Sequence, residues 1–564
     1  MTDNTYAQAH RDHVKTFMLL LVLAYLLVYI LPNGLRPLSI PDETRYAEMP
    51  REMISSGDWI VPRLIDLRYF EKPVLGYWLN AISISIFGEN NFAVRLPSAL
   101  SMGISAWFIW LLLVRTGYER RTALAGAAVF LTLFEVLMIG SIAILDSPFS
   151  MFLTAGMVLF YLSTECADNK VRQRRYLAGS GVMYGLAFLT KGFLAFALPG
   201  IILLPFILIT KKYNLIWRSS WVILFVIITI APWSIAIHLR EPDYWHYFVW
   251  EEHVRRFLSP NAQHAAPFYY YFISLPIAAF PWIGFLPAAV AGHFKKSQNI
   301  SLNWYLILWL CLPLLFFSIS SGKLISYILP CMAPLAVLVT IGTINYLKSG
   351  NQRWFVFGSI ISTATLAILL YLLLHNELSA SGTPYFNEKE QLKFIVLAGG
   401  LLIACILMFL SVFFTAIHSR LILVLCGAGM ILPLVNISVP NSVLGNKSPS
   451  FIINHVLNKT KDNAILVSDA NVVRSVAWVF KRSDIYLLST GEFGYGLSYP
   501  EHADKLLGVA GLKTLIEKQK RGEISNDIAV FCEEPCTQSL KTLLGHHADQ
   551  MSNDEFSAWY IQAK

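Results

Sequence analysis

A dense group of charged residues follows the first apolar segment of the chain. The stretch SIPDETRYAEMPREM begins at position 39 and is highly charged, although only 14% of all residues are Asp, Glu, Lys or Arg. Asp42 and Arg45 are three residues apart and Asp42 and Tyr46 four apart, so a helix here would place all three on one face. A second interpretation is that Asp42, which follows Pro41, is simply the N-cap of that helix.

Further residues able to do chemistry lie in short polar segments within apolar sequence. They are Tyr69, Glu71 and Lys72 in RYFEKP (68–73), Asp146 in ILDSPF (144–149), Lys191 in LTKGFL (189–194), His253 and Arg256 in YWHYFVWEEHVRRF (244–257), and Lys323 and Tyr327 in SSGKLISYILP (320–330). The basic residues among them suit a buried anion, because Arg offers a planar fork and Lys a point charge to phosphate oxygens. In a membrane protein, a lipid phosphate is the natural anion.

The elements that must position these residues are membrane helices. Hydrophobic residues make up 55% of the 564 positions and the mean hydropathy is +0.53, whereas a soluble chain would carry about a quarter charged residues. Long apolar runs predict a polytopic α-helical membrane protein with about thirteen transmembrane helices. The predicted spans are 17–31, 96–114, 122–140, 148–165, 176–190, 193–210, 219–238, 267–291, 303–320, 325–346, 354–374, 393–415 and 421–438.

The basic residues between spans predict their orientation. The apolar stretch VLGYWLNAISISIFG (74–88) is short for a membrane span and carries Gly, Asn and Ser. If it does not cross the membrane, five basic loops face the cytoplasm, as the positive-inside rule requires; if it crosses, all five face outward. We therefore expect 74–88 to be an interfacial or re-entrant helix within a large outer loop, 32–95. The first span would be a retained anchor with a cytoplasmic N-terminus, and the tail would lie outside.

The roles of the charged residues depend on the side of the membrane on which they lie. Lys at the bilayer centre costs roughly 2.5–3.5 kcal/mol, so Lys191 and Lys323 could instead extend their ammonium groups to lipid headgroups. Asp146 could be a helix N-cap, and His253 could be a structural histidine. The predicted topology nevertheless gathers basic residues on the outer side, against the positive-inside bias, and this favours anion binding.

The chain changes character after about position 438. Apolar runs with β-type composition, AILVSD, DIYLLS and DIAVFC, alternate with helical stretches such as GLKTLIEKQKR. This pattern predicts a small C-terminal periplasmic α/β domain, 439–564, after a transmembrane domain, 1–438. Cys532 and Cys536 could form a disulfide in an oxidising compartment; a zinc site is disfavoured, because no second Cys/His pair at ligand spacing accompanies them.

Several blocks resemble one family of membrane enzymes. PDETRYAEMPREMISSGDWIVP, LRYFEKPVLGYW, FGENNFAVR, REPDYWHYFVWEEHVRRF, HAAPFYYY, SGKLISYILP and TGEFGYGLSYP are similar to those of the bacterial undecaprenyl phosphate-aminoarabinose:lipid A transferases of the GT-C glycosyltransferase superfamily. The resemblance implies a GT-C fold in the bacterial inner membrane with a periplasmic active site. It also implies transfer of 4-amino-4-deoxy-L-arabinose from undecaprenyl phosphate to lipid A phosphates, which confers resistance to polymyxin and cationic antimicrobial peptides.

The resemblance also suggests roles for the residues above. We expect Asp42 and Asp146 to be catalytic, the donor phosphate to bind Arg45, Lys72, Lys191, Arg256, Tyr69 and Tyr327, and Glu71 and His253 to hold a divalent ion such as zinc, magnesium or manganese. The expected partners are the lipid-linked donor, lipid A and membrane lipids, without nucleic acid, and the chain is expected to be a monomer. Two alternatives stay open: another GT-C transferase that uses a polyprenyl-phosphate sugar, such as a protein O-mannosyltransferase, and a flippase for a lipid-linked sugar.

Overall fold

The structure, a computed structural model, describes residues 2–166, 168–255, 264–295, 299–379, 384–431, 434–545 and 548–563. The chain divides into two compact units. The helical unit comprises Met1–Asn33, Arg95–Ala236 and Trp245–Ser438, and the mixed unit comprises Gly34–Val94, Ile237–Tyr244 and Val439–Lys564. The sequence grouped the loop 32–95 with the membrane spans, whereas its contacts group 34–94 with the C-terminal region.

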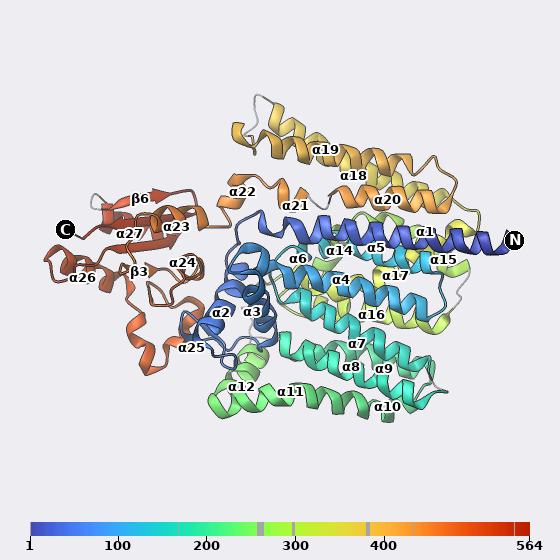
Figure 1. The fold of residues 1–564 in the computed structure, drawn as a ribbon, viewed down its shortest axis with the longest axis horizontal. Coiled ribbons are helices and arrows are strands. Elements are labelled where there is room, and N and C mark those ends of the chain that lie inside the picture. The colour runs from blue at the N-terminus through green and yellow to red at the C-terminus, as the bar shows by residue number, and fades with distance from the viewer. Residues whose placement is uncertain are drawn as a thin grey trace. The chain divides into compact units, whose positions relative to one another are not determined.

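Long helices lie side by side in the helical unit (Figure 1). The helices wholly or mainly within it are α1 (Thr2–Tyr25), η1 (Leu26–Ile30), η2 (Leu31–Gly34), α4 (Asn91–Arg115), α5 (Arg120–Leu131), α6 (Phe134–Gly140), α7 (Asp146–Thr164), α8 (Lys170–Lys191), α9 (Leu194–Thr210), α10 (Asn214–Arg218), α11 (Ser220–Arg240), α12 (Tyr244–His246), η3 (Tyr247–Arg255), α14 (Tyr270–Ala278), η4 (Trp282–Phe285), α15 (Leu286–Lys295), α16 (Ile300–Ile319), η5 (Ile325–Ile328), α17 (Leu329–Lys348), α18 (Arg353–Leu378), η6 (Glu388–Glu390), α19 (Gln391–Leu410), α20 (Ile417–Ile431) and α21 (Leu434–Ile437).

These helices support a polytopic membrane protein. Among the described residues, eight are long and apolar enough to cross a membrane, or up to ten if each of two bent pairs is one span. The bent pairs are α5 with α6, at 65°, and α14 with the segment Trp282–His293, at 98°. Every predicted span overlaps a helix or a bent pair, but the number that cross the membrane stays a prediction.

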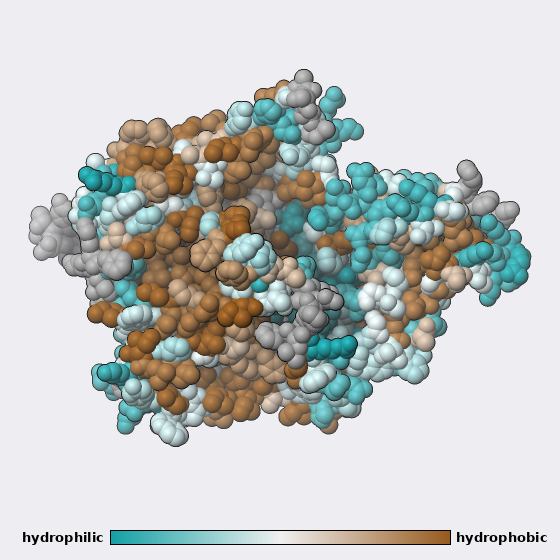
Figure 2. Space-filling view, turned by 180° about the vertical axis from the view of Figure 1, so that it is seen from behind, coloured by the Kyte–Doolittle hydropathy of each residue, from teal (hydrophilic) through white to brown (hydrophobic). Residues whose placement is uncertain are grey.

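Burial separates central helices from peripheral ones. The apolar window of α7 is 94% buried, whereas that of the first span, Val14–Gly34, is 6% buried. The peripheral side chains are large and apolar, and Figure 2 shows hydrophobic residues covering much of the surface of the helical unit. An apolar exterior of this extent is stable only in contact with lipid.

Close packing of backbones builds the centre of the helical unit. A Cβ atom on Gly292 of α15 would lie 1.8 Å from the carbonyl oxygen of Gly342 of α17. Only glycine allows this approach, as is common where membrane helices pack through small residues. The contact holds α17 firmly, and α17 follows directly after η5, which carries Tyr327.

The mixed unit combines short helices with two sheets. Its elements are α2 (Asp42–Ser56), β1 (Arg63–Leu64), β2 (Leu67–Arg68), α3 (Leu75–Phe87), α22 (Asn441–Gly445), α23 (Ser450–Leu457), β3 (Ile465–Ser468), α24 (Val473–Phe480), β4 (Ile485–Leu487), η7 (Gly491–Phe493), α25 (Gly494–Leu497), η8 (Pro500–Lys505), α26 (Gly508–Lys520), β5 (Ile528–Glu533), α27 (Cys536–Leu544), β6 (Asp549–Ser552) and β7 (Phe556–Ile561). Helix α3, the predicted non-spanning stretch, is about 20 Å long, well short of a bilayer core of about 30 Å.

The C-terminal region folds as the predicted α/β arrangement. Its five strands are ordered β4-β3-β5-β7-β6. Strand β3 pairs in parallel with β4 and β5, and β7 pairs antiparallel with β5 and β6. The three predicted strand runs correspond to β3, β4 and β5, and the predicted helix corresponds to α26. Strands β6 and β7 were not predicted, because DQMS and FSAWYI carry little alternation of polar and apolar residues.

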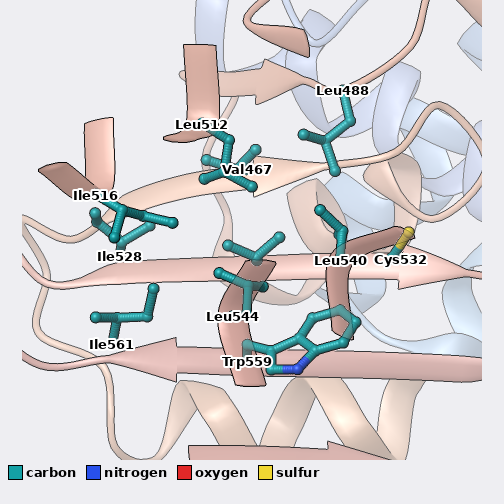
Figure 3. Close-up of a cluster of buried hydrophobic side chains, with 11 residues drawn as sticks. Val467, Leu488, Leu512, Ile516, Ile528, Cys532, Leu540, Leu544, Trp559 and Ile561 are labelled. Carbon is teal, nitrogen blue, oxygen red and sulfur yellow. The ribbon is translucent and has the colours of Figure 1, made fainter. Parts of the chain in front are cut away.

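A buried apolar cluster holds α26 and α27 against one face of this sheet (Figure 3). Alternate residues of β5 point into it, including Ile528 and Cys532, together with Trp559 of β7. The intervening Phe531 instead contacts Phe480 of α24, with ring centroids 5.7 Å apart. Because successive strand residues face opposite sides, α24 covers the other face of the sheet.

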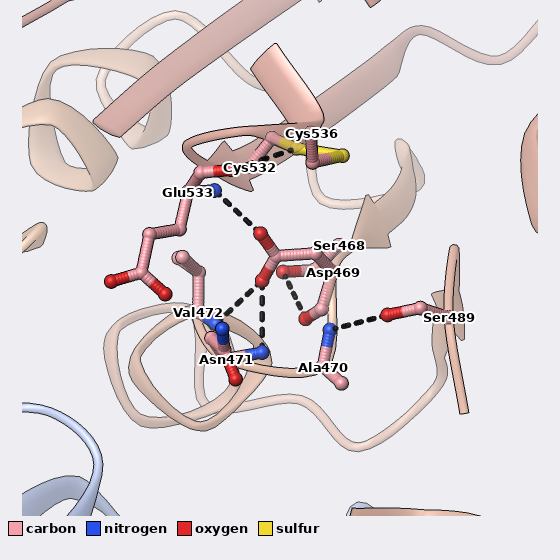
Figure 4. Close-up of a disulfide and its surroundings, with 9 residues drawn as sticks. All are labelled: Ser468, Asp469, Ala470, Asn471, Val472, Ser489, Cys532, Glu533 and Cys536. Carbon is pink, nitrogen blue, oxygen red and sulfur yellow. Dashed lines mark hydrogen bonds between the residues drawn. A yellow bond between two sulfur atoms is a disulfide. The ribbon is translucent and has the colours of Figure 1, made fainter. Parts of the chain in front are cut away.

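The two cysteines of the tail form a disulfide (Figure 4). Cys532 is the last but one residue of β5 and Cys536 is the first of α27, so the bond ties this strand to this helix. Beside it, the buried carboxylate of Asp469 accepts hydrogen bonds from the backbone N–H groups of Val472, at 2.8 Å, and Glu533. Burial raises the pKa of Asp469. The disulfide that the sequence allowed is therefore present, and it joins the two sulfur atoms directly.

Candidate functional site

Asp42 begins α2 but does not cap it. The N-cap position is occupied by Pro41, and no side chain makes a capping hydrogen bond there. The Asp42 carboxylate instead accepts a hydrogen bond from the Arg45 guanidinium, with Oδ1 and Nη1 3.1 Å apart. The N-cap interpretation is therefore wrong, and the predicted sharing of one helix face by Asp42 and Arg45 is confirmed. Its carboxylate is 52% exposed, which leaves it open to a substrate.

Arg45 lies at the centre of a chain of alternating charges within the mixed unit. Its Nη2 is 2.6 Å from Oε2 of Glu492 in η7, and Oε1 of the same glutamate is 3.0 Å from Nη2 of Arg474 in α24. Arg474 is only 2% exposed and also donates to the carbonyl of Ala470. The order Asp42, Arg45, Glu492, Arg474 thus alternates negative and positive groups and sets two guanidiniums on one carboxylate.

Several polar atoms of this cluster are buried and have no hydrogen-bond partner among the described residues. They are Nε of Arg45, Nε of Arg474 and the hydroxyl of Tyr69. The Tyr69 ring lies beside Arg45, with its centroid 5.7 Å from Cζ. Burial raises the pKa of Tyr69 well above its ordinary value, so this hydroxyl is a donor at any physiological pH. Buried donors without acceptors are rare in native proteins and mark places where a ligand oxygen can bind.

Glu71 and Lys72 follow Tyr69 on the same segment and are half-buried. The Lys72 ammonium donates to the backbone carbonyl of Glu71 at 2.9 Å. The segment is held by its neighbours, because Phe70 packs edge-on against Tyr244 and against Tyr495 of α25. The mixed unit therefore brings together Asp42, Arg45 and Tyr69 directly, with Glu71 and Lys72 adjacent in the chain.

A second charged pair lies in the helical unit. Asp146 is the first residue of α7 and Lys191 the last residue of α8, and Oδ1 and Nζ are 2.7 Å apart. The N-cap of α7 is Leu145 and no side chain caps the helix, so the N-cap interpretation of Asp146 is also wrong. The side chains are 15% and 13% exposed, so the pair is largely, but not completely, shielded.

Aromatic rings surround Lys191. Its Nζ lies 5.0 Å from the centroid of Tyr327 and 5.9 Å from that of Phe149. Only one of the three N–H groups of Lys191 has a hydrogen-bond acceptor among the described residues, which is Asp146. Lys191 therefore does not extend to headgroups as an isolated lysine would. It is a fixed cation between a carboxylate and two rings, with two N–H groups available for an anion.

His253 lies against the residue that follows Lys191. Its Nδ1 is 2.7 Å from the carbonyl oxygen of Phe248; because a carbonyl can only accept, Nδ1 carries the proton. A Cβ atom on Gly192, at φ +86°, would lie 3.0 Å from Nε2 of His253. The rings of Phe193 and Phe248 pack against the imidazole.

Only part of the set of protein ligands that the predicted metal ion needs can be identified. The Nδ1–H of His253 is bound to a backbone carbonyl, which is also the arrangement seen in many metal-binding histidines. Glu71 is a half-buried carboxylate. The two belong to different units, and zinc sites in proteins use three or four protein ligands. Among the described ranges, the one group of three clustered ligand side chains is Asp469 with Cys532 and Cys536.

Two other predicted residues differ from the rest. Lys323 is 4% exposed and its ammonium donates to the backbone carbonyls of Ala266 and Ser320. It thereby ties two loop segments together, which favours a structural role over the anion-binding role suggested by the sequence. Arg256 lies outside the described residues.

Sequence reasoning missed two members of the mixed-unit cluster. Glu492 lies in the block TGEFGYGLSYP, which carried the family resemblance, so it could have been singled out there. Arg474 lies in the tail helix NVVRSVAWVF, where a lone Arg among apolar residues was the signal. The helical unit adds Glu135, which is 2% exposed and whose two carboxylate oxygens have no hydrogen-bond partner in the part of the chain that the structure describes.

Comparisons with known proteins point to one family. A family model for dolichyl-phosphate-mannose-protein mannosyltransferases matches residues 14–248, and one for the C-terminal domain of the arabinosyl transferase ArnT matches residues 444–559. The crystal structure of ArnT from Cupriavidus metallidurans bound to undecaprenyl phosphate superposes with a TM-score of 0.82 at 19% identity, over 97% of this chain and 98% of that one. The chain therefore has the GT-C fold.

Two relatives carry the same name. The undecaprenyl phosphate-alpha-4-amino-4-deoxy-L-arabinose arabinosyl transferase of Aeromonas hydrophila is 38% identical over 513 residues, which is 90% of this chain and 92% of the relative. That of Photorhabdus laumondii is 37% identical over 547 residues, 96% of this chain and 97% of the relative. With this identity over nearly its whole length, the chain belongs to the undecaprenyl phosphate-α-4-amino-4-deoxy-L-arabinose arabinosyl transferase family of membrane glycosyltransferases.

Proposed function

We propose that this protein transfers 4-amino-4-deoxy-L-arabinose from undecaprenyl phosphate to phosphate groups of lipid A. The observation that carries the proposal is the 37–38% identity, over at least nine-tenths of the chain, to proteins named for this sugar donor. The product would carry a cationic sugar on each modified phosphate. Because this lowers the negative charge of the outer surface, it would weaken the binding of polymyxin and other cationic peptides.

The chemistry is an exchange of one phosphate ester for another. An oxygen of the lipid A phosphate attacks the anomeric carbon, the bond from that carbon to the undecaprenyl phosphate oxygen breaks, and its electron pair leaves with the departing phosphate. The attacking oxygen is already anionic near neutral pH, so no proton must be removed from it. The larger demand is to hold two anions together and to stabilise the leaving group, which fixed cations in a water-poor site do well.

In the helical unit, Lys191 is suited to the donor phosphate. Its ammonium is held by Asp146 and by the ring of Tyr327, and two of its N–H groups can meet phosphate oxygens. A cation that is already oriented requires no rearrangement when negative charge develops on the leaving oxygen. Asp146 would fix the position of this cation, and Tyr327 would supply a hydroxyl.

In the mixed unit, Arg45 and Tyr69 present buried donors. Arg45 is held on both sides by carboxylates, which fixes the direction of its unused Nε–H. Lys72 would add a second cation from the neighbouring segment, and Arg256 a third. Asp42, the most exposed acid of the cluster, is our candidate for the carboxylate that pairs with the sugar ammonium or with positive charge at the anomeric carbon.

We keep a divalent ion as part of the proposal. Glu71 and His253 would be its protein ligands, and the protonated Nδ1 of His253 leaves Nε2 as the ligand atom. A bound ion would supply positive charge that stabilises the departing phosphate. Metal content of the purified protein, measured by mass spectrometry with and without Glu71→Gln and His253→Ala, tests this directly. Equal metal content in all three proteins would contradict the assignment.

The proposed setting is the bacterial inner membrane, with about thirteen spans. The active site and the 439–564 domain would face the periplasm, and the protein would act as a monomer. Single cysteines introduced at positions 45 and 191 should react with a membrane-impermeant reagent added to spheroplasts. Labelling only after lysis would place these positions on the cytoplasmic side and contradict the proposal.

Enzymatic transfer can be tested with purified components. The protein in nanodiscs is given undecaprenyl phosphate-aminoarabinose and lipid A, and mass spectrometry detects lipid A with an added aminoarabinose. Asp42→Asn should be folded and inactive.

A second candidate function, transfer of a polyprenyl-linked sugar to protein, is favoured by the mannosyltransferase model that matches 14–248. Sugar on a peptide acceptor, with none on lipid A, would replace the first proposal by the second.

A further inference from the structure

A long groove runs along the outside of the helical unit between α1, α5 and α20. It consists of two adjoining hollows of about 440 and 630 Å³. The residues that line both are Phe17, Ile422 and Leu425, so the hollows form one continuous depression. Helix α5 contacts both α1 and α20 and forms the floor between them. None of Asp146, Lys191 and Tyr327 lines either hollow, so the groove is separate from the charged pair described above.

One end of the groove is lined mainly by apolar side chains. The larger side chains there come from α1, η1 and α20, and include Leu20, Leu27 and Met430. Its three hydroxyl groups are already engaged: those of Tyr25 and Tyr29 donate to backbone carbonyls, and that of Thr132 accepts from the indole N–H of Trp282. This end therefore offers a surface for hydrocarbon and no free group for a polar head.

The other end of the groove is basic. Arg121 at the start of α5, Lys348 at the end of α17 and His418 at the start of α20 line it, opposed by a single acid, Glu119. Glu119 and Lys348 are 3.4 Å apart and more than half exposed, so their pairing is weak and easily exchanged. Arg121 has no ion-pair or hydrogen-bond partner within the described ranges. The positive-inside rule assigns this end to the cytoplasmic leaflet.

The dimensions match one leaflet of a bilayer. From His418 to Met430, α20 rises about 18 Å, and half of a hydrocarbon core of about 30 Å is about 15 Å. A chain whose head lies at Arg121 would thus extend along α20 to the apolar end. Basic pockets between helices at the cytoplasmic surface are typical binding sites for anionic lipid headgroups.

We propose that this groove binds one anionic diacyl glycerophospholipid from the leaflet at the Arg121 end. Its phosphate lies between Arg121 and Lys348, and an acyl chain lies along α20 over Ile422 and Leu425. Charge complementarity at one end and an apolar channel at the other fix the orientation of the lipid. The inference does not depend on the sugar-transfer reaction, because it uses none of the residues assigned to it.

The predicted preference for an anionic headgroup is tested by comparing lipids of different charge. Delipidated full-length protein is titrated with phosphatidylglycerol or phosphatidylcholine in nonionic detergent, and bound lipid is counted by native mass spectrometry. We expect at least tenfold weaker phosphatidylglycerol binding for Arg121→Gln with Lys348→Gln, because this variant removes both cations that face the phosphate. Arg115→Gln with Arg353→Gln, both exposed and outside the groove, is the matched control and should bind as the wild type does.

The acyl channel is tested by filling it. Gly429 lines the apolar hollow, and among the described residues nothing lies within 4 Å of a Cβ atom placed there, so Gly429→Leu adds a side chain at the groove wall. Gly399 of α19 also has open space around it and lies outside the groove, so Gly399→Leu is the control. We expect loss of the tightly bound lipid for Gly429→Leu only.

Three results would overturn the inference. Equal retention of phosphatidylcholine and phosphatidylglycerol would show a groove without charge selection. Unchanged phosphatidylglycerol binding in the Arg121 and Lys348 double variant would place the headgroup elsewhere. Loss of undecaprenyl phosphate binding, and not of phosphatidylglycerol binding, in Gly429→Leu would identify the groove as a channel for the donor's polyprenyl chain.

Discussion

The two charged clusters of this protein are built on different plans. In the helical unit, Asp146 and Lys191 form a simple one-to-one pair at the ends of two neighbouring helices. In the mixed unit, Arg45 lies in a linear chain of four charged groups, where Glu492 contacts two guanidiniums. Removing both members of a simple pair leaves no unpaired charge. Removing Glu492 from the chain leaves two guanidiniums close together without the carboxylate between them.

Because the two clusters differ in this way, we expect mutations in one to affect function and mutations in the other to affect stability. The Lys191 ammonium keeps two N–H groups for a ligand, so its removal should affect turnover first. Glu492 contacts two guanidiniums and holds them in place, so its removal should affect folding first. Mutations in the two clusters should therefore produce different signatures, and the following experiments test this from the largest expected effect to the smallest.

The largest effect is expected at Lys191. Lys191→Ala should lower kcat/KM for aminoarabinose transfer by at least ~100-fold, because a preorganised cation at a leaving group contributes on this scale. Steady-state transfer to lipid A in nanodiscs measures it. Lys170→Ala, at the exposed first turn of the same helix, is the control and should retain activity.

A double variant sharpens this result. Asp146→Asn with Lys191→Met removes both charges of the pair, so it should unfold at nearly the temperature of the wild type and remain inactive. Full activity in this variant would show that the pair is only structural.

The next effect is expected at Glu492. Glu492→Gln leaves Arg45 and Arg474 without their shared carboxylate and should lower the free energy of unfolding by about 3 kcal/mol, since both charges are largely buried. Denaturant unfolding followed by tryptophan fluorescence measures it. Glu501→Gln breaks a pair with Arg68 whose acid is 51% exposed, and should cost at most about 1 kcal/mol. Equal losses of stability in the two variants would contradict the expected difference between the buried chain at Glu492 and the surface pair at Glu501.

A smaller effect is expected where the helical unit turns after Lys191. Gly192→Ala places a Cβ atom 2.8 Å from Cζ of Phe248 at a φ of +86°, so it should cost about 1–3 kcal/mol and displace His253. Thermal unfolding in detergent measures the cost, and metal content tests whether His253 is a ligand. Gly200→Ala in α9, where nothing lies within 4 Å of the new atom, should leave both unchanged.

A pH dependence of stability is also expected in the mixed unit. Burial, followed by repulsion from Glu48, raises the pKa of Glu52 from 4.5 to about 8. The folded state therefore keeps a proton that the unfolded state has lost, so stability falls as pH rises from about 4.5 to about 8. Glu52→Gln, which imitates the protonated acid, should flatten the dependence. Parallel curves for the wild type and the variant would contradict this sign.

Local spacing made part of these clusters predictable. The pairing of Asp42 with Arg45 followed from positions three apart on one helix, and the strands β3, β4 and β5 followed from short apolar runs bounded by polar residues. Both features depend on neighbours in the sequence. The short length and polar residues of 74–88 likewise distinguished α3 from the long spans.

Contacts between distant segments were not predictable. Asp146 and Lys191 were each singled out, but their pairing depends on the packing of α7 against α8, which fixes residues 45 positions apart. The contact between Arg45 and Glu492 joins positions 447 apart. No period or spacing in a single sequence specifies such a contact, because it depends on how whole elements pack. Arg474 was missed for the same reason.

The separation between Arg45 and its partners has a consequence for synthesis. Arg45 emerges from the ribosome with the first tenth of the chain, but Glu492 and Arg474 are among the last residues to be made. Until translation is nearly complete, this guanidinium can pair with Asp42 but not with Glu492. A chain released early would therefore insert its helices into the bilayer yet lack the setting of Arg45, so incomplete products would occupy the membrane without handling the lipid-linked sugar.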